Sequence, residues 1–302
     1  MSKFKPDDIS VVFVPTKRVL KIMPTNQYLI RKQQLASVFE DTMAQIKQSA
    51  DLTSAMEHSL HNQQFIPESA IISISDVPKE DKPANIIVSR LRSFEAAAQY
   101  IGKRTAVLNF ASATNPGGGV EKGASAQEEC LCRVSTLYPC LADQKMRASF
   151  YTPHRKNGNT LHNDDIIYTP NVLVIKDDNH NLLSEPFSVD IISCAAPNLR
   201  ERPSNQYNTG DRIRVQISDD ELLALHEKRA KKIFAAAVAN DVDALILGAF
   251  GCGAFKNNPR IVAQAYKNVL PLFVDYFQTI EFAIYCRPND LENYNAFNSI
   301  LV

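Results

Sequence analysis

The 302-residue chain carries 33 basic and 33 acidic side chains, so its formal net charge is zero and no overall positive field exists to hold a nucleic-acid backbone. Hydrophobic residues make up 45% of the chain and charged residues 22%, which is ordinary for a globular protein, and no apolar run reaches the about 18 residues of a membrane-spanning helix. One large domain, or one domain with an extension, is therefore expected.

Two features of the chain bear on its compartment. Residues 1–14 lack the basic start, apolar run and small-residue cleavage site of a signal peptide. The six cysteines form no CxxC pair, and Cys194 and Cys286 lie in apolar, strand-like runs, which favours buried free thiols over a disulfide framework. Cys130 and Cys132 point to different faces of an expected helix, so no metal site is predicted. We therefore expect a soluble, cytoplasmic protein in a reducing compartment.

The N-terminal part of the chain has helical periodicity. Apolar residues recur at helical spacing between Leu35 and Ile46, and a second short helix is expected near 52–60, so residues 26–62 are predicted to be helical. These helices are polar enough to pack as an appendage on something larger. The chain is therefore divided into an N-terminal helical extension, 1–65, and a main domain, 66–302.

Beyond this extension, short apolar runs alternate with helical segments. Strands are expected at 70–75, 84–91, 105–110, 172–176, 189–196, 244–250 and 280–286. Helices are expected at 94–101, 127–141, 219–239, 259–278 and 291–301. Ser218 with Glu221 forms a capping box, and Asn258 precedes a proline at a helix start. The alternation indicates a layered α/β fold with a parallel or mixed sheet.

Two polar stretches, 151–170 and 198–217, are predicted to be surface loops. The second stretch carries four arginines: Arg200, Arg202, Arg212 and Arg214. They could line a local basic cleft or form a solvated loop face, and both interpretations stay open.

Seven of the ten glycines fall in two short loops. The first loop is Asn-Pro-Gly-Gly-Gly-Val-Glu-Lys-Gly at 115–123, and the second loop is Gly-Ala-Phe-Gly-Cys-Gly at 248–253. Glycine is needed where backbone adopts a positive φ or approaches a ligand closely. Each loop follows an expected strand and precedes an expected helix, where α/β sheets bind ligands. Because helix N-termini present free N–H groups, we expect the two loops to hold one anion between them, of the diphosphate kind.

Glu128 and Glu129 follow the first loop at the start of an expected helix. Ser125-Ala-Gln-Glu128 matches a capping box, so Glu128 is either a cap on the Ser125 N–H or a site carboxylate. Glu129, about 100° further round the helix, is the freer group. Cleavage of a glycosidic bond needs a carboxylic acid to protonate the departing oxygen, and a neighbouring carboxylate in a partly dry cleft raises the pKa of that acid. The pair therefore predicts acid catalysis on a nucleotide-like substrate.

The motifs of other nucleotide sites are absent. Neither loop contains GxxxxGK[ST], and no GxGxxG is present. The spacing of Gly117, Gly119 and Gly123 is only loosely dehydrogenase-like, and the one Tyr-x-x-x-Lys, at 28–32, precedes the loop, in the wrong order for a short-chain dehydrogenase. Hydride transfer is therefore not expected.

The Gly-Gly-Gly at 117–119, seven intervening residues and the Gln-Glu-Glu at 127–129 resemble the signature of poly(ADP-ribose) glycohydrolases. Three further runs resemble the bacterial or microbial branch of that family: Leu-Asn-Phe-Ala-Ser-Ala-Thr-Asn-Pro at 108–116, Ile-Tyr-Thr-Pro-Asn-Val at 167–172 and Cys-Ala-Ala-Pro-Asn at 194–198. The run from Gly248 to Pro259 resembles the second, diphosphate-binding loop of the macrodomain fold. The similarity covers about residues 85–290.

This resemblance implies a three-layer α/β/α macrodomain with a mixed central sheet, preceded by an N-terminal helical extension. Glu129 would be the acid that cleaves the ribose–ribose O-glycosidic bond, and Glu128 would orient the ribose hydroxyls. The substrate-binding residues implied are Asn115, Gly117, Gly118, Gly119, Gln127, Gly251, Cys252, Gly253, Ala254 and Phe255.

Within that set, Asn115 would lie near the distal ribose and the three glycines would wrap the diphosphate. Phe255 would either stack near the adenosine half or be a core aromatic. Asn109 is a strand-end cap or a sugar contact, with no preference between them.

The implied reaction releases ADP-ribose by hydrolysis, without a metal or an organic cofactor. The implied partners are poly(ADP-ribose) or ADP-ribosylated proteins, with ADP-ribose as product and with no membrane and no sequence-specific nucleic acid. Two alternatives stay open: a hydrolase that removes single ADP-ribose units, and a non-catalytic ADP-ribose-binding macrodomain.

Overall fold

The computed structural model describes residues 25–206, 209, 210 and 212–302. Its seven strands form one sheet in the order β1–β4–β5–β3–β6–β7–β2. Their bounds are β1 Gln64–Ile66, β2 Asn85–Ser89, β3 Thr105–Phe110, β4 Ile166–Lys176, β5 Leu182–Cys194, β6 Ala244–Leu247 and β7 Thr279–Ala283. Strand β4 runs antiparallel to both of its neighbours, and the other pairs are parallel. The mixed sheet predicted from the sequence is confirmed.

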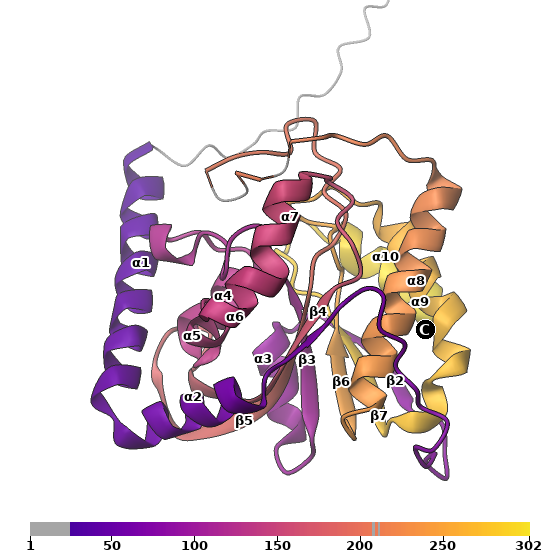
Figure 1. Ribbon diagram of the computed structural model, residues 1–302, viewed down its shortest axis with the longest axis horizontal. Helices are drawn as coiled ribbons and strands as arrows, with labels where there is room; N and C mark the ends of the chain where they lie inside the picture. The colour runs from indigo at the N-terminus through magenta and orange to yellow at the C-terminus, as the bar shows by residue number, and fades with distance from the viewer. Residues whose placement is uncertain (1–24, 207–208, 211) are drawn as a thin grey trace, which may run out of the picture.

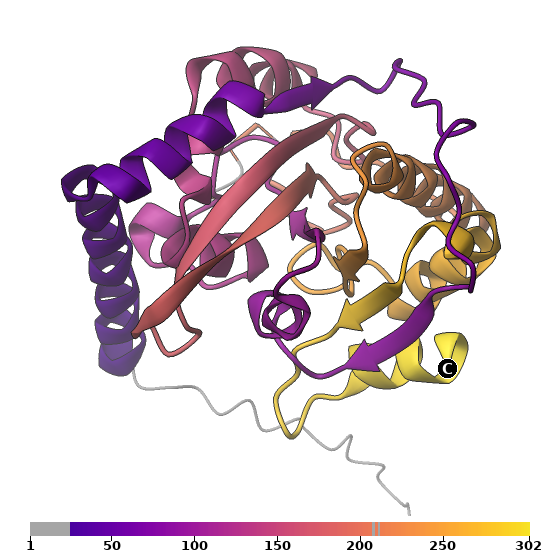
Figure 2. The same ribbon diagram turned by 90° about the horizontal axis from the view of Figure 1, so that it is seen from below.

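Helices cover both faces of this sheet. One face carries α8 (Asp219–Val238), α9 (Pro259–Val269) and α10 (Glu292–Leu301). The opposite face carries α1 (Thr25–Gln48), α2 (Ala50–Asn62), α3 (Ser93–Ala97), α4 (Gln127–Val134), α5 (Leu137–Leu141), α6 (Gln144–Met146) and α7 (Thr152–Asn157). Short 3-10 or π turns lie at Ala98–Tyr100, Val120–Lys122, Arg147–Tyr151, Leu270–Leu272 and Val274–Tyr276. Figure 1 shows α1 and the α8–α10 group at opposite sides with the strands between them, and Figure 2 shows the same layers from below.

Two hydrophobic cores fill the spaces between these layers. In β3, Ala106 and Leu108 belong to the core beneath α8–α10, whereas Val107 belongs to the core beneath α3–α5. Strands buried on both faces are apolar almost without interruption, which explains the runs seen in the sequence. Because β3 and β6 are parallel neighbours, the loops that follow them leave the same edge of the sheet. The two cores, one on each face of the sheet, confirm the three-layer arrangement.

The N-terminal helices are tied to the rest by buried polar contacts. The guanidinium of Arg133, fully buried in α4, donates from Nε to the Leu35 carbonyl at 3.1 Å and from Nη2 to the Ala124 carbonyl. In return, Thr42 Oγ1 of α1 donates to the Arg133 carbonyl at 2.6 Å. A side chain at Gly123 would overlap the carbonyl of Lys32 in α1. Helix α1 therefore lies directly against the first loop. The boundary at residues 65/66 stays a prediction, and residues 1–24 of the expected extension lie outside the described residues.

Several expected elements differ from the structure. No strand forms at 70–75: Ile72 and Ile74 pack singly against the core beneath α8–α10, while Ile71 is 96% exposed. The helix expected at 127–141 is interrupted between α4 and α5, where the Thr136 N–H donates to the Leu173 carbonyl of β4. The stretch 151–170 is not a surface loop, because it contains α7 and the start of the buried strand β4. Tertiary contacts thus overrode local composition in all three places.

Other expectations are confirmed. The expected strand at 105–110 coincides with β3. Ser218 and Glu221 form the reciprocal capping box of α8, and the Asn258 side chain caps α9. The helical stretch 26–62 forms α1 and α2, which are separated at Ser49, the N-cap of α2. None of the described helices has an apolar stretch long enough to cross a membrane.

Candidate active site

The first loop is built from consecutive tight turns. Gly117 and Gly118 have φ angles of 64° and 58°, in the left-handed region that favours glycine. A Cβ on Gly117 would lie 2.7 Å from the ring of Tyr138, and a Cβ on Gly118 would overlap Oε1 of Glu129. Both residues must therefore lack a side chain: Gly117 to pass Tyr138, and Gly118 to let the Glu129 carboxyl group lie against the loop.

Glu129 lies in the first turn of α4 with its carboxyl group under this loop. Its Oε1 accepts a hydrogen bond from the Gly119 N–H at 2.9 Å, and its Oε2 is buried with no hydrogen-bond partner. The residue is 7% exposed. Burial raises the pKa of this carboxyl group, and the Gly119 N–H and the Arg133 charge offset that rise only in part. The unpartnered oxygen is available to carry a proton.

Glu128 is also buried, and its partners come from the strand end and the segment after it. One carboxylate oxygen accepts from the Ser112 N–H at 2.8 Å, and the other lies 3.5 Å from Nδ2 of Asn109. Burial first, and then the charge of Glu129, raise the pKa of Glu128 well above its ordinary value. Of the two roles left open for Glu128, the cap on the Ser125 N–H does not form: the N-cap of α4 is Ala126, with no side-chain cap bond. The Ser112 N–H outcompetes the helix end for this carboxylate.

Asn109, for which the sequence left two roles open, lies wholly buried at the end of β3. Its Nδ2 donates to Ser193 Oγ at 2.9 Å and faces Glu128, while its Oδ1 has no partner. Its amide thus bridges β3, β5 and the carboxylate pair.

Gln127 joins α4 to β3. Its Oε1 accepts from the Phe110 N–H at 2.9 Å, and its Nε2 donates to the Leu108 carbonyl at 2.8 Å and to Ser93 Oγ at 3.1 Å. Because both N–H donors of this amide are engaged, the side chain sets where α4 begins relative to the strand end. Its assignment to substrate binding stays a prediction.

Arg155 of α7 braces the start of the first loop. Its Nη2 donates to Oδ1 of Asn115 at 2.9 Å, and its Nε donates to the Thr114 carbonyl. This arginine holds in place a side chain that the sequence assigned to substrate binding. No sequence signal pointed to Arg155, because it lies in the stretch expected to be a loop and comes 40 residues after its partner.

The second loop is pinned to the end of β5. Gly251 has a φ of 75°, and a Cβ there would lie 2.7 Å from that of Ala196. Asn257 Nδ2 donates to the Pro197 carbonyl at 2.7 Å and to the Gly251 carbonyl at 3.1 Å. The imidazole Nε2 of His226 lies 2.9 Å from Asn257 Oδ1. The buried Asn257 and His226 thus fix the loop backbone, and sequence reasoning missed both.

The tip of this loop turns outward. Gly253 and Ala254 are exposed, whereas Cys252 is half-buried with its thiol directed to the Phe250 carbonyl, and burial raises the pKa of that thiol. Phe255 packs against the core beneath α8–α10, and its other neighbours are the His162 ring at 6.0 Å and the Arg200 guanidinium at 5.7 Å. Both predicted roles of Phe255 fit this half-buried position, and the choice stays open.

The two loops begin side by side. The rings of Phe110, at the end of β3, and Phe250, in the second loop, lie 5.6 Å apart between centroids. A cavity of about 220 Å³ adjoins the first loop; it borders Gly118 and Gly119, and no residue of the second loop lines it. Among the described residues, no three His, Cys, Asp or Glu side chains converge as a metal site.

These features form one arrangement: a glycine-walled loop, two buried carboxyl groups with raised pKa values, and a second glycine loop from the adjacent strand. Carboxyl groups with raised pKa values hold a proton to higher pH than ordinary ones do, and they can donate it to a departing oxygen.

Comparison with known proteins agrees with this arrangement. The family described as microbial-type PARG, catalytic domain, where PARG is poly(ADP-ribose) glycohydrolase, matches residues 32–177. Over these residues the chain resembles the microbial-type PARG catalytic domain. No curated protein sequence matches the chain.

Solved structures of microbial PARG enzymes superpose on most of the chain. The poly(ADP-ribose) glycohydrolase of Thermomonospora curvata is 26% identical with a TM-score of 0.77, over 89% of this chain and 100% of that one. A second structure of it, bound to the inhibitor ADP-HPD, has a TM-score of 0.73 at 26% identity, over 88% and 99% of the two chains. The Deinococcus radiodurans enzyme in complex with ADP-ribose is 28% identical with a TM-score of 0.67, over 82% and 96%. The match to microbial PARG structures supports the macrodomain fold predicted from the sequence.

Proposed function

We infer that this protein hydrolyses the ribose–ribose O-glycosidic bond of poly(ADP-ribose) and releases ADP-ribose, with Glu129 as the general acid. The observation that carries the assignment is the Glu129 carboxyl group: it is buried beneath a glycine loop, has a raised pKa and keeps one oxygen without a partner. The match to the PARG catalytic-domain family supplies the substrate class. A protein that only binds ADP-ribose needs neither a raised pKa nor an unpartnered oxygen on this glutamate.

The proposed chemistry begins with a proton on Glu129. The protonated carboxyl group donates it to the departing glycosidic oxygen while positive charge develops at the anomeric carbon. Water then attacks that carbon and gives up a proton to the Glu129 carboxylate, which regenerates the acid. Glu128 and Glu129 are adjacent buried acids, so they titrate as a coupled pair, and the charge of one favours a proton on the other. Once Glu129 has released its proton, the pair stabilises the cationic centre, and Glu128 orients the ribose hydroxyls.

The backbone of the two loops would hold the ADP-ribose unit. We propose that Gly117 to Gly119 and the segment Gly251 to Phe255 enclose its diphosphate, and that Asn115 contacts the distal ribose. The parallel pairing of β3 and β6 supports this, because it delivers both loops to one edge of the sheet. The substrate would be poly(ADP-ribose) or an ADP-ribosylated protein.

The test is incubation with poly(ADP-ribose), following free ADP-ribose by chromatography for wild type and Glu129→Gln. Loss of a general acid should lower turnover by about 100-fold or more. Because Gln retains the acceptor for the Gly119 N–H, the variant should still bind ADP-ribose, measured by calorimetry. Full turnover by Glu129→Gln would contradict the assignment.

The two alternatives give different results in the same experiment. A mono-ADP-ribosyl hydrolase would release ADP-ribose from a singly modified protein but not from polymer. A reader would bind ADP-ribose and cleave neither.

A further inference from the structure

The cavity beside the first loop shares Asn115, Gly118 and Gly119 with the site proposed for the ADP-ribose unit and extends beyond that site to Lys122 and Arg147. Gly118 and Gly119 form part of its wall, and the same two residues lie against the Glu129 carboxyl group. The cavity therefore adjoins the loop that lies against the proposed acid. No residue of the second loop lines it.

Charge in this cavity is predominantly positive. Lys122, Arg147 and Arg155 line it together with one acidic residue, Glu121. Glu121 accepts a hydrogen bond from the Tyr138 hydroxyl, and Arg155 is held by Asn115. Lys122 and Arg147 are exposed and come from two segments, the first loop and the turn after α6, where Arg147 Nε donates to the Ala142 carbonyl at 2.7 Å. Exposed cations that line a cavity attract an anion from solution.

The chemistry of the proposed reaction indicates which anion the cavity would bind. A general acid has to lie within hydrogen-bond distance of the departing oxygen. In poly(ADP-ribose) that oxygen belongs to the ribose of the next ADP-ribose unit, and the same ribose carries a diphosphate. When the terminal unit lies between the two loops, its neighbour must leave past Glu129 on the side that the second loop does not enclose.

We propose that the cavity is a subsite for the departing part of the polymer, with Lys122 and Arg147 binding the diphosphate of the neighbouring unit. The proposal rests on the proposed function of the glycine loops and Glu129. It makes the cavity a specificity determinant: a leaving group with a diphosphate is bound there, whereas an uncharged leaving group is not. The protein should accordingly favour polymer over singly modified acceptors that present no phosphate.

The test compares two substrates that share the ADP-ribose unit and differ in the leaving group. One is poly(ADP-ribose), and the other is a 1″-O-aryl glycoside of ADP-ribose, whose leaving group carries no phosphate. In the double variant Lys122→Gln/Arg147→Gln, kcat/KM for the polymer should fall about tenfold more than kcat/KM for the aryl glycoside. Because fewer cations then meet the polymer, its kcat/KM should also depend less steeply on salt concentration.

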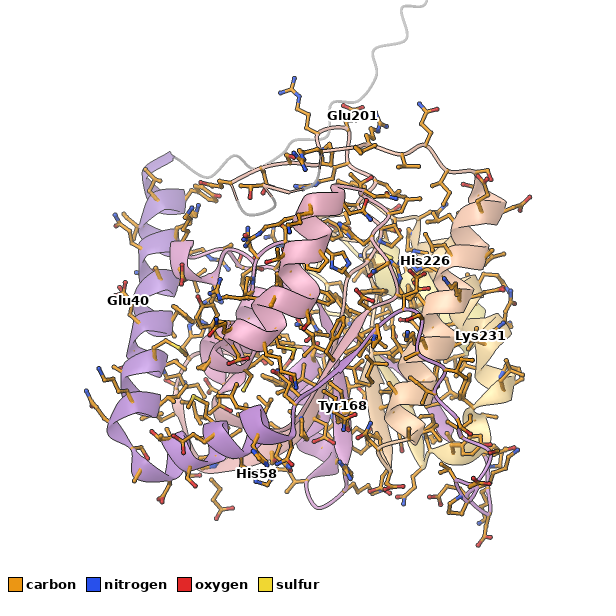
Figure 3. All side chains as sticks on the ribbon, in the orientation of Figure 1. Glu40, His58, Tyr168, Glu201, His226 and Lys231 are labelled. Atoms are coloured by element: carbon orange, nitrogen blue, oxygen red, sulfur yellow. The ribbon has the colours of Figure 1, made fainter. Side chains whose placement is uncertain are left out.

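The matched control removes two exposed cations elsewhere: Lys103→Gln/Lys231→Gln. Lys231 lies on α8, across the sheet from the first loop (Figure 3), and Lys103 precedes β3. This control has the same net charge as the test variant, so it removes any effect of overall charge on polymer binding. It should keep the wild-type ratio of the two kcat/KM values.

Each remaining outcome is decisive. Equal losses on both substrates would overturn the subsite, because Lys122 and Arg147 would then act on the shape of the first loop. No loss on either would overturn it as well. A charge-reversed variant, Arg147→Glu, should deepen the polymer-selective loss, and its thermal unfolding shows whether it is folded. If wild type cleaves the aryl glycoside but releases nothing from polymer, the proposed function fails, and that result is distinct from failure of the subsite.

Discussion

Among single residues, the position of the proposed acid depends most directly on the missing side chain of Gly118. Gly118 has both a left-handed backbone and the Glu129 carboxyl group where its Cβ would be. We expect Gly118→Ala to displace Glu129 and lower kcat on polymer at least tenfold, in addition to a loss of about 1–2 kcal/mol of stability from the positive φ.

The control for this prediction is Gly102→Ala. Gly102 has a φ of 93° and no atom within 4 Å of the position of a Cβ. It should show a similar loss of stability in urea unfolding while kcat stays near that of wild type. If both variants kept full activity, the steric role of Gly118 would be refuted.

At the element scale, α4 is held from two sides. Gln127 joins its start to β3, and Arg133 joins its end to α1 through the Leu35 carbonyl. Helix α1 thus supports the helix that carries the proposed acid.

We expect Arg133→Met to destabilise the protein by about 2–4 kcal/mol, because the fully buried guanidinium is lost and the Leu35 and Ala124 carbonyls each lose a donor. Urea unfolding measures this change. The matched control is Arg92→Met, whose contact with Asp178 at 3.7 Å is partly exposed and should contribute less than about 1 kcal/mol. Equal losses of stability in the two variants would mean that the α1–α4 contact contributes no more to stability than a partly exposed ion pair.

Elements with strong local patterns could be predicted from the sequence. The elements that were missed depend on contacts with residues far away in the chain. The apolar run of β3 and the capping signals of α8 and α9 fix structure locally, and all three were found where expected. The run at 70–75 has strand composition but no neighbouring strand to pair with. Helix α7 has weak helical periodicity, and it is helical because Phe150 and Tyr151 just before it, and His154 within it, are buried.

At the scale of the whole molecule, the buried carboxyl pair links stability to pH. Burial raises the pKa values of Glu128 and Glu129 above the ordinary 4.5, so the folded state holds these protons more tightly than the unfolded state. Their contribution is therefore fully favourable below about pH 4.5 and is lost as pH rises through the raised pKa values. The lowered pKa values of His154 and His226 act in the opposite direction.

Comparing variants isolates the glutamate contribution. Glu129→Gln removes one ionisation, so its Tm relative to wild type should increase between pH 5 and pH 8, by about 2 °C for each kcal/mol relieved. Glu40→Gln, on the exposed face of α1 (Figure 3), should show no such trend. A Tm difference for Glu129→Gln that stayed constant with pH would mean that this carboxyl group does not change its ionisation in that range.

The α/β class, the two glycine loops and the adjacent glutamates could be read from the chain alone, because periodicity, glycine placement and motif spacing are local properties. Three contacts could be known only from the folded molecule: Glu128 accepts from the Ser112 N–H rather than from Ser125, Gln127 directs its amide to β3, and Arg155 holds Asn115. These choices are competitions among hydrogen-bond donors and acceptors that lie far apart in the chain. Their outcome depends on which groups the packed sheet and helices bring together and shield from water.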